Sequence, residues 1–454
     1  MSLKETLIEY TSKNIYPMHM PGHKRQLQYP YSIDMTEVEG VDDLHDPSEV
    51  IAWEQQRLAK IYGADHAFML VGGSTVGNLS AIYAACNEGD LILIQRNSHK
   101  SVYNGATIRH LKVGYIKSEI DENGIYRACT LLQIKEAIEK YGMPRAIVIT
   151  SPTYEGFYCD IAEITDYCED NNIITIVDEA HGAHLGMDEH FPNQASSLAD
   201  ITICSLHKTL PALTQTAALF LNNKNVEFQK IRDALDIFET SSPSYVLMNS
   251  ISECLDYLEE SNESFRLYVD KLEGFYKISG QLKNLKIIED DYKKKDIGKI
   301  VISTKHAGIT GVELATILRK KYEIETELSS FSYVLAMTSV MDSQTGFDRL
   351  KKALLEIDKE LSCSELQVPI NADNLNWNKK LELWEAKTRE TISIGLEEAC
   401  GHISGEMICI YPPGAPIIVP GEEITKAQID IIEKALQQRI HVTGIANGNV
   451  YIVK

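Results

Sequence analysis

Short apolar runs alternate with amphipathic stretches between residues 66 and 222. The segments 76–86 and 161–172 have helical patterns, and a further helix is predicted over 48–62, because its apolar residues recur at helical spacing. Apolar strands separated by helices are typical of βαβ units. The pattern therefore predicts an α/β domain with a mostly parallel central sheet and helices on both faces. Its strands are predicted at 67–73, 91–95, 146–150, 201–208 and 217–222, and in the segment 173–182, which opens as a continuous β-branched run.

The pattern changes after about residue 260, where charged helical stretches dominate. Strands are predicted at 299–304 and 332–339, and helices at 311–322 and 348–361. We expect a smaller α+β domain here, in which helices and strands are less regularly mixed. The predicted organisation is an N-terminal arm (1–45), a major domain (46–260) and a C-terminal α+β domain (261–454).

The net charge of −21 argues against general nucleic-acid binding, which needs a basic surface. No run reaches the roughly 18 apolar residues of a membrane helix, and the N-terminus lacks the apolar core of a secretory signal. The nine cysteines include no CxxC pair, so neither a metal site nor a disulfide framework is expected. These features predict a cytoplasmic protein without membrane or nucleic-acid partners. Acidic surfaces usually serve solubility, although the charge also suits a cationic small substrate.

Four polar features follow predicted strands: Lys208, Asp178, the turn 72–78 and His99. Taken singly, each has an ordinary explanation as a solvated lysine, a loop carboxylate, a tight turn or a surface histidine. Together they offer an amine nucleophile, a carboxylate for a protonated pyridine, a phosphate-binding helix start and a flat ring for stacking. These are the parts of a pyridoxal 5'-phosphate site.

The sequence resembles the bacterial ornithine/lysine/arginine decarboxylases, which are pyridoxal phosphate enzymes with the aspartate aminotransferase fold. Matching segments extend over nearly the whole chain, and the lysine segment is the most specific of them. They are MPGHK (20–24), DDLHDP (42–47), GGSTVGN (72–78), RNSHKS (96–101), SPTYEGFYCDI (151–161), DEAHGAH (178–184), SLHKTLPALTQTA (205–217), TSSPSY (240–245) and YPPGAPIIVPGE (411–422).

The resemblance implies a role for individual residues. Lys208 would be the Schiff-base lysine, Asp178 the partner of the pyridinium nitrogen, and His99 the residue that stacks on the ring. Ala180 would pack beneath the ring, and His181 would support the site from the same turn. The phosphate would be held by Ser74, Thr75, Ser205 and His207, with Ser242 reaching the phosphate of a partner subunit; weaker substrate candidates are Tyr154 and Glu406.

The implied activity is decarboxylation of lysine, arginine or ornithine, in polyamine biosynthesis or in acid resistance. The chain resembles a short form without the N-terminal receiver-like domain of the large members, which predicts a homodimer with shared active sites. It departs from the family pattern at Ile203, Pro211, 25–26 and Ile410, so the substrate stays open. An aminotransferase or carbon–sulfur lyase of the same fold, or a non-catalytic paralogue, are the alternatives.

Overall fold

The computed structural model describes residues 15–19, 24, 33–38, 40–260, 262–291, 294–369, 377–411 and 415–454. Most of the predicted N-terminal arm therefore lies outside the described residues. The same holds for 20–23 of the MPGHK segment and for 412–414 of the segment YPPGAPIIVPGE.

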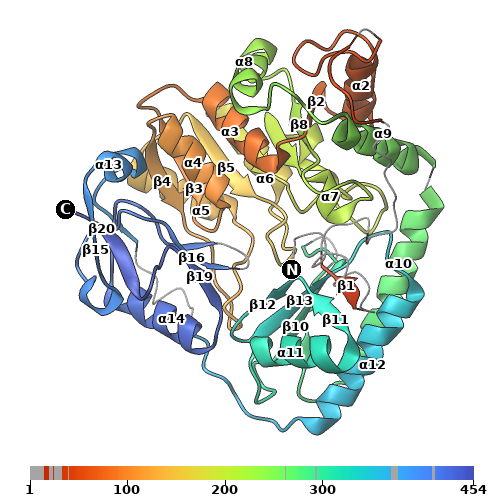
Figure 1. Ribbon diagram of the computed structural model, residues 1–454, viewed down its shortest axis with the longest axis vertical. Coiled ribbons are helices and arrows are strands. Elements are labelled where there is room, and N and C mark those ends of the chain that lie inside the picture. The colour runs from red at the N-terminus through yellow and green to blue at the C-terminus, as the bar shows by residue number, and fades with distance from the viewer. Residues whose placement is uncertain are drawn as a thin grey trace.

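A seven-stranded sheet forms the centre of the larger part of the molecule, with the order β2-β8-β7-β6-β5-β3-β4 (Figure 1). The strands from β7 to β4 in this order are parallel, whereas β8 runs antiparallel to both of its neighbours. The predicted mostly parallel sheet is therefore confirmed. Its strands are β2 (His66–Leu70), β3 (Leu91–Gln95), β4 (Lys112–Ile116), β5 (Ala146–Thr150), β6 (Ile174–Asp178), β7 (Ile201–Cys204) and β8 (Ala217–Leu221).

Helices cover both faces of this sheet, as predicted. Ile92 and Ile94 of β3 belong to one apolar cluster with Val102, whereas Leu93 between them packs on the other face with Ile134. This alternation follows from the two-residue period of a strand. The helices of this region are α2 (Val50–Tyr62), α3 (Gly73–Ala85), α4 (Lys100–Ile108), α5 (Leu131–Tyr141), α6 (Ile161–Asp170), α7 (Leu206–Thr209), α8 (Phe228–Phe238) and α9 (Tyr245–Glu260), with a short 3₁₀ helix at Ala195–Ser197.

Gly77 allows α3 to lie directly on the sheet. A Cβ atom at this position would stand 2.7 Å from Cγ2 of Ile203 in β7, so a larger residue would push the helix away. The close approach brings the first turn of α3 over the end of β7. The glycine thus serves the geometry at the sheet edge.

A second, antiparallel sheet has the order β12-β13-β10-β9 and is flanked by helices (Figure 1). Strand β1 (Tyr16–Met18) joins this part of the molecule by pairing in parallel with β11 (Ile324–Thr326). Its other elements are α10 (Asn262–Tyr276), a 3₁₀ helix at Ser279–Gln281, β9 (Lys286–Ile287), β10 (Lys299–Ser303), α11 (Gly311–Tyr322), β12 (Leu328–Ser329), β13 (Tyr333–Met337) and α12 (Gln344–Glu360).

The described residues from 377 onward form small sheets around a separate apolar cluster that includes Ile408 and Ile432. The region predicted as one C-terminal domain thus contains two sets of sheets, and the boundaries at 45/46 and 260/261 stay predictions. The elements are β14 (Asn378–Lys379), α13 (Leu383–Thr388), β15 (Thr391–Gly395), a 3₁₀ helix at Leu396–Glu398, β16 (Ile408–Tyr411), β17 (Pro416–Ile418), β18 (Glu422–Glu423), α14 (Lys426–Gln437), β19 (His441–Thr443) and β20 (Asn449–Val453).

No helix in the described parts of the chain has both the length and the apolar character needed to cross a bilayer.

Candidate active site

A cavity of about 280 Å³ lies at the carboxyl ends of β3, β5, β6 and β7. This edge is where open parallel sheets usually bind ligands. Of the twelve residues to which the resemblance gives a role, the structure brings ten together in the lining, and Ser242 and Glu406 are the two that it leaves outside. The ten are Ser74, Thr75, His99, Tyr154, Asp178, Ala180, His181, Ser205, His207 and Lys208.

Lys208 lies on α7, directly after β7, and is half-buried in the cavity. Its Nζ atom is 3.1 Å from Nε2 of His181. Burial lowers the pKa of Lys208 below its ordinary value, against the opposing effect of the carboxylates of Asp178 and Glu327. A lysine with a lowered pKa has more of the neutral amine, which is the nucleophilic form.

Asp178 is the last residue of β6 and is buried. Its Oδ1 accepts a hydrogen bond from the backbone N–H of Ala180 at 3.1 Å, and its Oδ2 accepts one from Nδ2 of Asn78 at 2.9 Å. Asn78 also donates to Oγ of Ser101 at 3.0 Å. Asn78 lines the cavity but was not among the predicted residues. The signal for it was a polar side chain one helical turn after Ser74 on α3.

Two hydroxyl groups meet beside the start of α3. Oγ of Ser74 lies 2.6 Å from Oγ of Ser205, which precedes α7. The glycine-rich turn before the helix is held by Glu239, whose Oε2 accepts from the backbone N–H groups of Val71 and Gly72 at 3.1 Å each. Hydroxyl groups next to a helix N-terminus are well suited to bind an anion such as phosphate.

His99 caps the N-terminus of α4 and is exposed to the hollow of the cavity. Its Nδ1 atom is 2.8 Å from Oγ of Ser101, which fixes the orientation of the ring. The protein around the hollow desolvates the ring and lowers the pKa of His99, and the nearby Lys208 acts in the same direction. The imidazole is therefore neutral near pH 7 and presents a flat, uncharged surface.

Two carboxylates lie at the side of the cavity that is formed by the segment after β5. Tyr154 donates a hydrogen bond from its hydroxyl to Oε1 of Glu327, and its ring packs 4.5 Å from that of His181. Glu155 lines the cavity, is buried, and accepts a hydrogen bond from the hydroxyl of Tyr333 at 2.7 Å. Burial raises the pKa of Glu155. The sequence contains many carboxylates that could bind a basic substrate. Only the fold identifies Glu155 as one that lines the cavity.

Ser242 and Glu406 lie elsewhere. Ser242 is exposed in the loop before α9, and its predicted contact with a partner subunit stays a prediction. Glu406 forms an ion pair with Lys387, with 3.0 Å between Oε2 and Nζ. This position gives no support to a contact between Glu406 and substrate.

Comparison with known proteins places the chain in one family. Residues 2–293 match the family model "Orn/Lys/Arg decarboxylase, major domain", and residues 382–445 match "Orn/Lys/Arg decarboxylase, C-terminal domain". The chain is 33% identical to the uncharacterized protein YaaO of Bacillus subtilis, over 97% of this chain and 95% of that one. It is 30% identical to an arginine decarboxylase of the same organism, over 99% and 96% of the two chains. It is 23% identical to the lysine decarboxylase LdcA of Pseudomonas aeruginosa, over 54% of this chain and 38% of that one.

Solved structures show the same fold. The lysine decarboxylase LdcF of Francisella novicida superimposes with a TM-score of 0.76 at 18% identity, over 92% of this chain and 73% of that one. An alanine–glyoxylate aminotransferase of Nostoc sp. superimposes with a TM-score of 0.54 at 14% identity, over 69% and 88%. The family that the sequence motifs predicted is thereby confirmed. The chain belongs to the ornithine/lysine/arginine decarboxylase family, and it is an enzyme that decarboxylates a basic amino acid.

Proposed function

We propose that this protein binds pyridoxal 5'-phosphate in the cavity at the carboxyl ends of β3, β5, β6 and β7, and decarboxylates arginine there. The observation that carries the proposal is the meeting of Lys208, Asp178 and His99 with a pair of hydroxyl groups in one cavity. These residues come from four separate segments that only the fold brings together.

The side chains present fit the cofactor. The hydroxyls of Ser74 and Ser205 beside the first turn of α3 suit its phosphate. The buried carboxylate of Asp178 suits a protonated pyridine nitrogen, because an opposite charge offsets the cost of burying the carboxylate. The exposed ring of His99 offers a stacking surface, and Thr75, Ala180 and His207 complete the proposed set.

When bound, pyridoxal phosphate supplies an electron sink for the pair of electrons released as the bond to the carboxylate breaks. Lys208 would attach the cofactor through its amine, and after substrate has displaced it the same amine can carry a proton to the α-carbon. Asp178 would keep the ring nitrogen protonated by ion pairing. The cavity walls would orient the substrate so that the carboxylate is the group lost.

Glu155 is the proposed partner of the positive end of the substrate. It is a buried carboxylate in the cavity lining, held by the hydroxyl of Tyr333. Since burial raises its pKa, an arriving cation would favour its ionised form and form a charge-assisted hydrogen bond. The carboxylate of Glu327, bound by Tyr154, adds negative potential on the same side.

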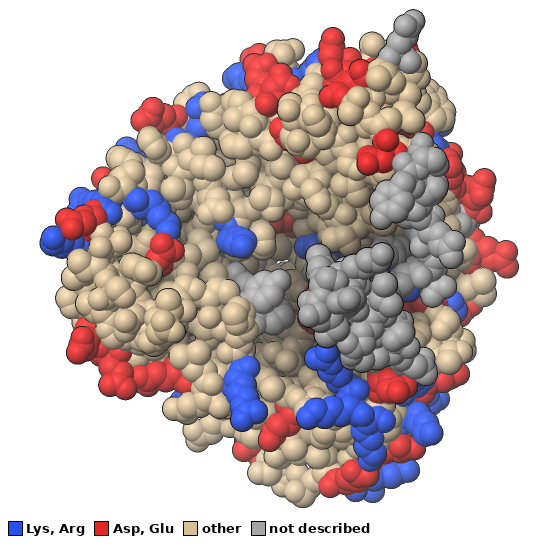
Figure 2. Space-filling view, viewed as in Figure 1, with Lys and Arg blue, Asp and Glu red and all other residues tan. Residues whose placement is uncertain are grey.

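On the face that Figure 2 draws, the acidic side chains in view lie mostly around the outer edge. Arginine is proposed as the substrate because relatives of nearly full length, from Bacillus subtilis and Bacillus anthracis, are named arginine decarboxylases, at 30% and 29% identity. The lysine decarboxylase of Pseudomonas aeruginosa matches only about half of this chain.

The test is a substrate panel with the purified protein and added pyridoxal phosphate. Release of labelled carbon dioxide from carboxyl-labelled arginine, lysine and ornithine is measured, together with formation of amine and of keto acid. We expect release from arginine with one equivalent of amine, and no release by the Lys208→Ala variant. Formation of keto acid without carbon dioxide would establish an aminotransferase instead, and an inactive protein that takes up no cofactor would overturn the proposal.

We also propose a cytoplasmic homodimer that serves polyamine synthesis, in which Ser242 of one subunit completes the site of the other. The exposure of Ser242 and its absence from the cavity lining of its own chain support this role. Mixing Lys208→Ala subunits with Ser242→Ala subunits tests it, because each mixed dimer contains one intact site. Recovery of activity in the mixture is expected, and no recovery would contradict a shared site.

A further inference from the structure

A row of three side chains, of which Lys299 and His181 are buried and Lys208 is half-buried, leads from the second sheet to the reactive amine. Nζ of Lys299, the first residue of β10, lies 2.7 Å from Nδ1 of His181. Nε2 of the same imidazole lies 3.1 Å from Nζ of Lys208. Lys299 is 1% exposed. A lysine of the antiparallel sheet thus reaches, through one histidine, the lysine on α7 at the edge of the parallel sheet.

The contacts of Lys299 determine which nitrogen of His181 carries the hydrogen. Burial and the positive charges of Lys208 and Lys299 hold the pKa of His181 well below its ordinary value, so the ring is neutral. A neutral imidazole has one N–H group and one lone pair. If Lys299 donates to Nδ1, the hydrogen of the ring lies on Nε2. His181 then donates to Nζ of Lys208, and this bond requires a lone pair on that amine.

The surroundings of Lys299 support its role as a donor. Its Nζ atom also lies 3.2 Å from the sulfur of Met337, a weak acceptor. Burial lowers the pKa of Lys299 to about 7, while the carboxylates of Asp296, Glu327 and Glu155 oppose this effect and Lys208 adds to it. The titratable and charged groups around Lys299 are His181, Lys208, Asp296, Glu155, Glu327, Tyr154 and Lys295. Nζ of Lys295 donates to the backbone oxygen of Lys299, and the ring centroid of Tyr154 lies 5.9 Å from Nζ of Lys299.

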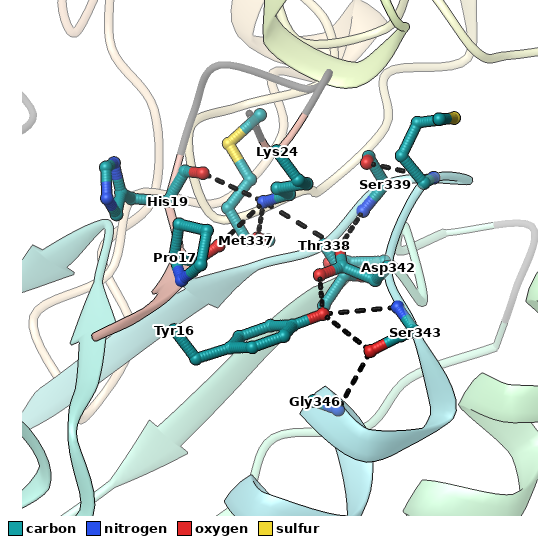
Figure 3. A network of polar contacts seen from close by, with 12 residues as sticks. Tyr16, Pro17, His19, Lys24, Met337, Thr338, Ser339, Asp342, Ser343 and Gly346 are labelled. Carbon is teal, nitrogen blue, oxygen red and sulfur yellow. Dashed lines mark hydrogen bonds and ion pairs between the residues drawn. The ribbon is translucent and has the colours of Figure 1, made fainter. Parts of the chain in front are cut away.

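The N-terminal arm fixes the strand that carries Met337. Nζ of Lys24 donates to the backbone oxygen atoms of Pro17, His19 and Met337 at 3.1, 2.8 and 2.9 Å (Figure 3). The same ammonium forms an ion pair with Asp342 at 3.7 Å, and Lys24 is 4% exposed. The backbone beside Lys299 is thus held in place by a buried cation of the arm.

We propose that Lys299 is a positioning residue of the decarboxylase: by donating to Nδ1 of His181 it makes Nε2 of that ring a donor to Lys208, and so keeps the reactive amine uncharged. The inference rests on the proposed function of Lys208 as the nucleophilic amine. Without Lys299, the hydrogen of His181 can move to Nδ1, and Nε2 can then accept a hydrogen bond from a charged Lys208.

The test uses the full chain without cofactor or substrate. Lysines are labelled with limiting isotopic acetic anhydride at a series of pH values, and mass spectrometry gives the reactivity of Lys208 at each pH. Lys299→Met replaces the donor with an uncharged side chain of similar length. In this variant, the midpoint of the curve of Lys208 reactivity against pH is expected to rise by about one pH unit. Its reactivity near pH 7.5 would then fall about tenfold. Lys299→Arg, which keeps an N–H donor at this position, is expected to restore reactivity toward that of the wild type.

A matched control is Lys286→Met, at an exposed lysine of β9 in the same sheet, which is expected to leave the midpoint unchanged. An unchanged midpoint in folded Lys299→Met would overturn the proposal. If Lys299→Met does not fold, nitrogen NMR of histidine-labelled wild-type protein decides instead. Hydrogen on Nε2 of His181 is expected, and hydrogen on Nδ1 would overturn the proposal.

Failure of this inference and failure of the proposed function give different results. Labelling of the cofactor-free protein reports on the amine of Lys208 alone. An unchanged midpoint in Lys299→Met therefore does not affect the evidence from carbon dioxide release by the wild type. Absence of cofactor uptake and of carbon dioxide release would instead refute the proposed function, whatever the labelling shows.

Discussion

Nδ2 of Asn78 on α3 donates a hydrogen bond to Oδ2 of Asp178 at the end of β6, over 2.9 Å and across 100 positions of sequence. The bond joins the helix that begins beside the paired hydroxyls to the carboxylate proposed for the pyridine nitrogen. Because Asn78 is 1% exposed and Asp178 is 3% exposed, water cannot readily replace the bond.

The first prediction concerns this bond. In Asn78→Leu, Asp178 loses a donor, and a hydrogen bond to a charged group contributes about 1.5–3 kcal/mol. We expect the affinity for pyridoxal phosphate to fall about tenfold to a hundredfold, as measured by absorbance titration of the cofactor-free protein. Ser80→Ala, a buried substitution on the same helix, is the control and should bind normally. Equal affinities in the two variants would contradict this role of Asn78.

The second prediction concerns the proposed substrate carboxylate. Glu155→Gln keeps the shape of the side chain but removes its charge. We expect KM for arginine to rise at least about tenfold, from the loss of one charge-assisted hydrogen bond, while the affinity for cofactor stays the same. Steady-state kinetics and cofactor titration give both values. Glu136→Gln, at an exposed position of α5, is the control, and a KM unchanged in Glu155→Gln would exclude Glu155 from substrate binding.

The third prediction concerns the pH dependence of stability. The pKa of Lys299 is lowered by burial from 10.5 to about 7 in the folded protein. Between these values the unfolded chain binds one proton more than the folded chain, so this group adds stability as pH rises from about 7 to 10.5. Below about pH 7 that contribution is lost. The slope for a single group is about 1.4 kcal/mol per pH unit.

Lys299→Met removes this slope. The free energy of unfolding of the variant, taken relative to that of the wild type, should therefore be highest near pH 7 and should fall as the pH rises toward 10. Thermal unfolding at several pH values measures the effect, with the exposed Lys286→Met as the control. A difference that is constant with pH would show that Lys299 does not titrate in this range.

The fourth prediction concerns the attachment of the C-terminal part to the sheet. NH2 of Arg96, next to the end of β3, forms an ion pair at 2.9 Å with Oε2 of Glu422, and both side chains are buried. Arg96→Met leaves Glu422 buried without its partner, which costs about 3–5 kcal/mol of the free energy of unfolding. The double variant Arg96→Met/Glu422→Leu should recover much of the loss in urea unfolding. Equal stability of the single and double variants would show that the ion pair does not hold the parts together.

Most of the sheet could be predicted because its strands are continuous apolar runs. Strand β4 could not, since Lys112 and Gly114 interrupt its pattern and Gly114 is required by the packing of Leu93 and Tyr141 against it. The amino-acid composition of β8 does not indicate the direction of the strand either. It runs antiparallel to β7, and the connection between the two strands contains only the four-residue helix α7.

The site residues that the motifs predicted gather in one cavity because most of them follow a parallel strand, and such strands end at one edge of the sheet. Asn78 and Lys299 do not follow the end of a parallel strand, and Glu155 follows β5 but was not singled out. Asn78 acts through a hydrogen bond to a distant strand, Glu155 is one of 65 acidic residues, and Lys299 belongs to another sheet. Their contacts with Asp178, Tyr333 and His181 are tertiary and are seen only in the fold.

The central claim is that the reactive amine of this decarboxylase is Lys208 in this cavity. The most direct measurement is borohydride reduction of the protein loaded with pyridoxal phosphate, followed by mass-spectrometric mapping of the modified lysine. We expect a single modified residue, Lys208, and loss of the modification and of carbon dioxide release in Lys208→Ala. A modification on another lysine, or none on a protein that still releases carbon dioxide from arginine, would contradict this claim.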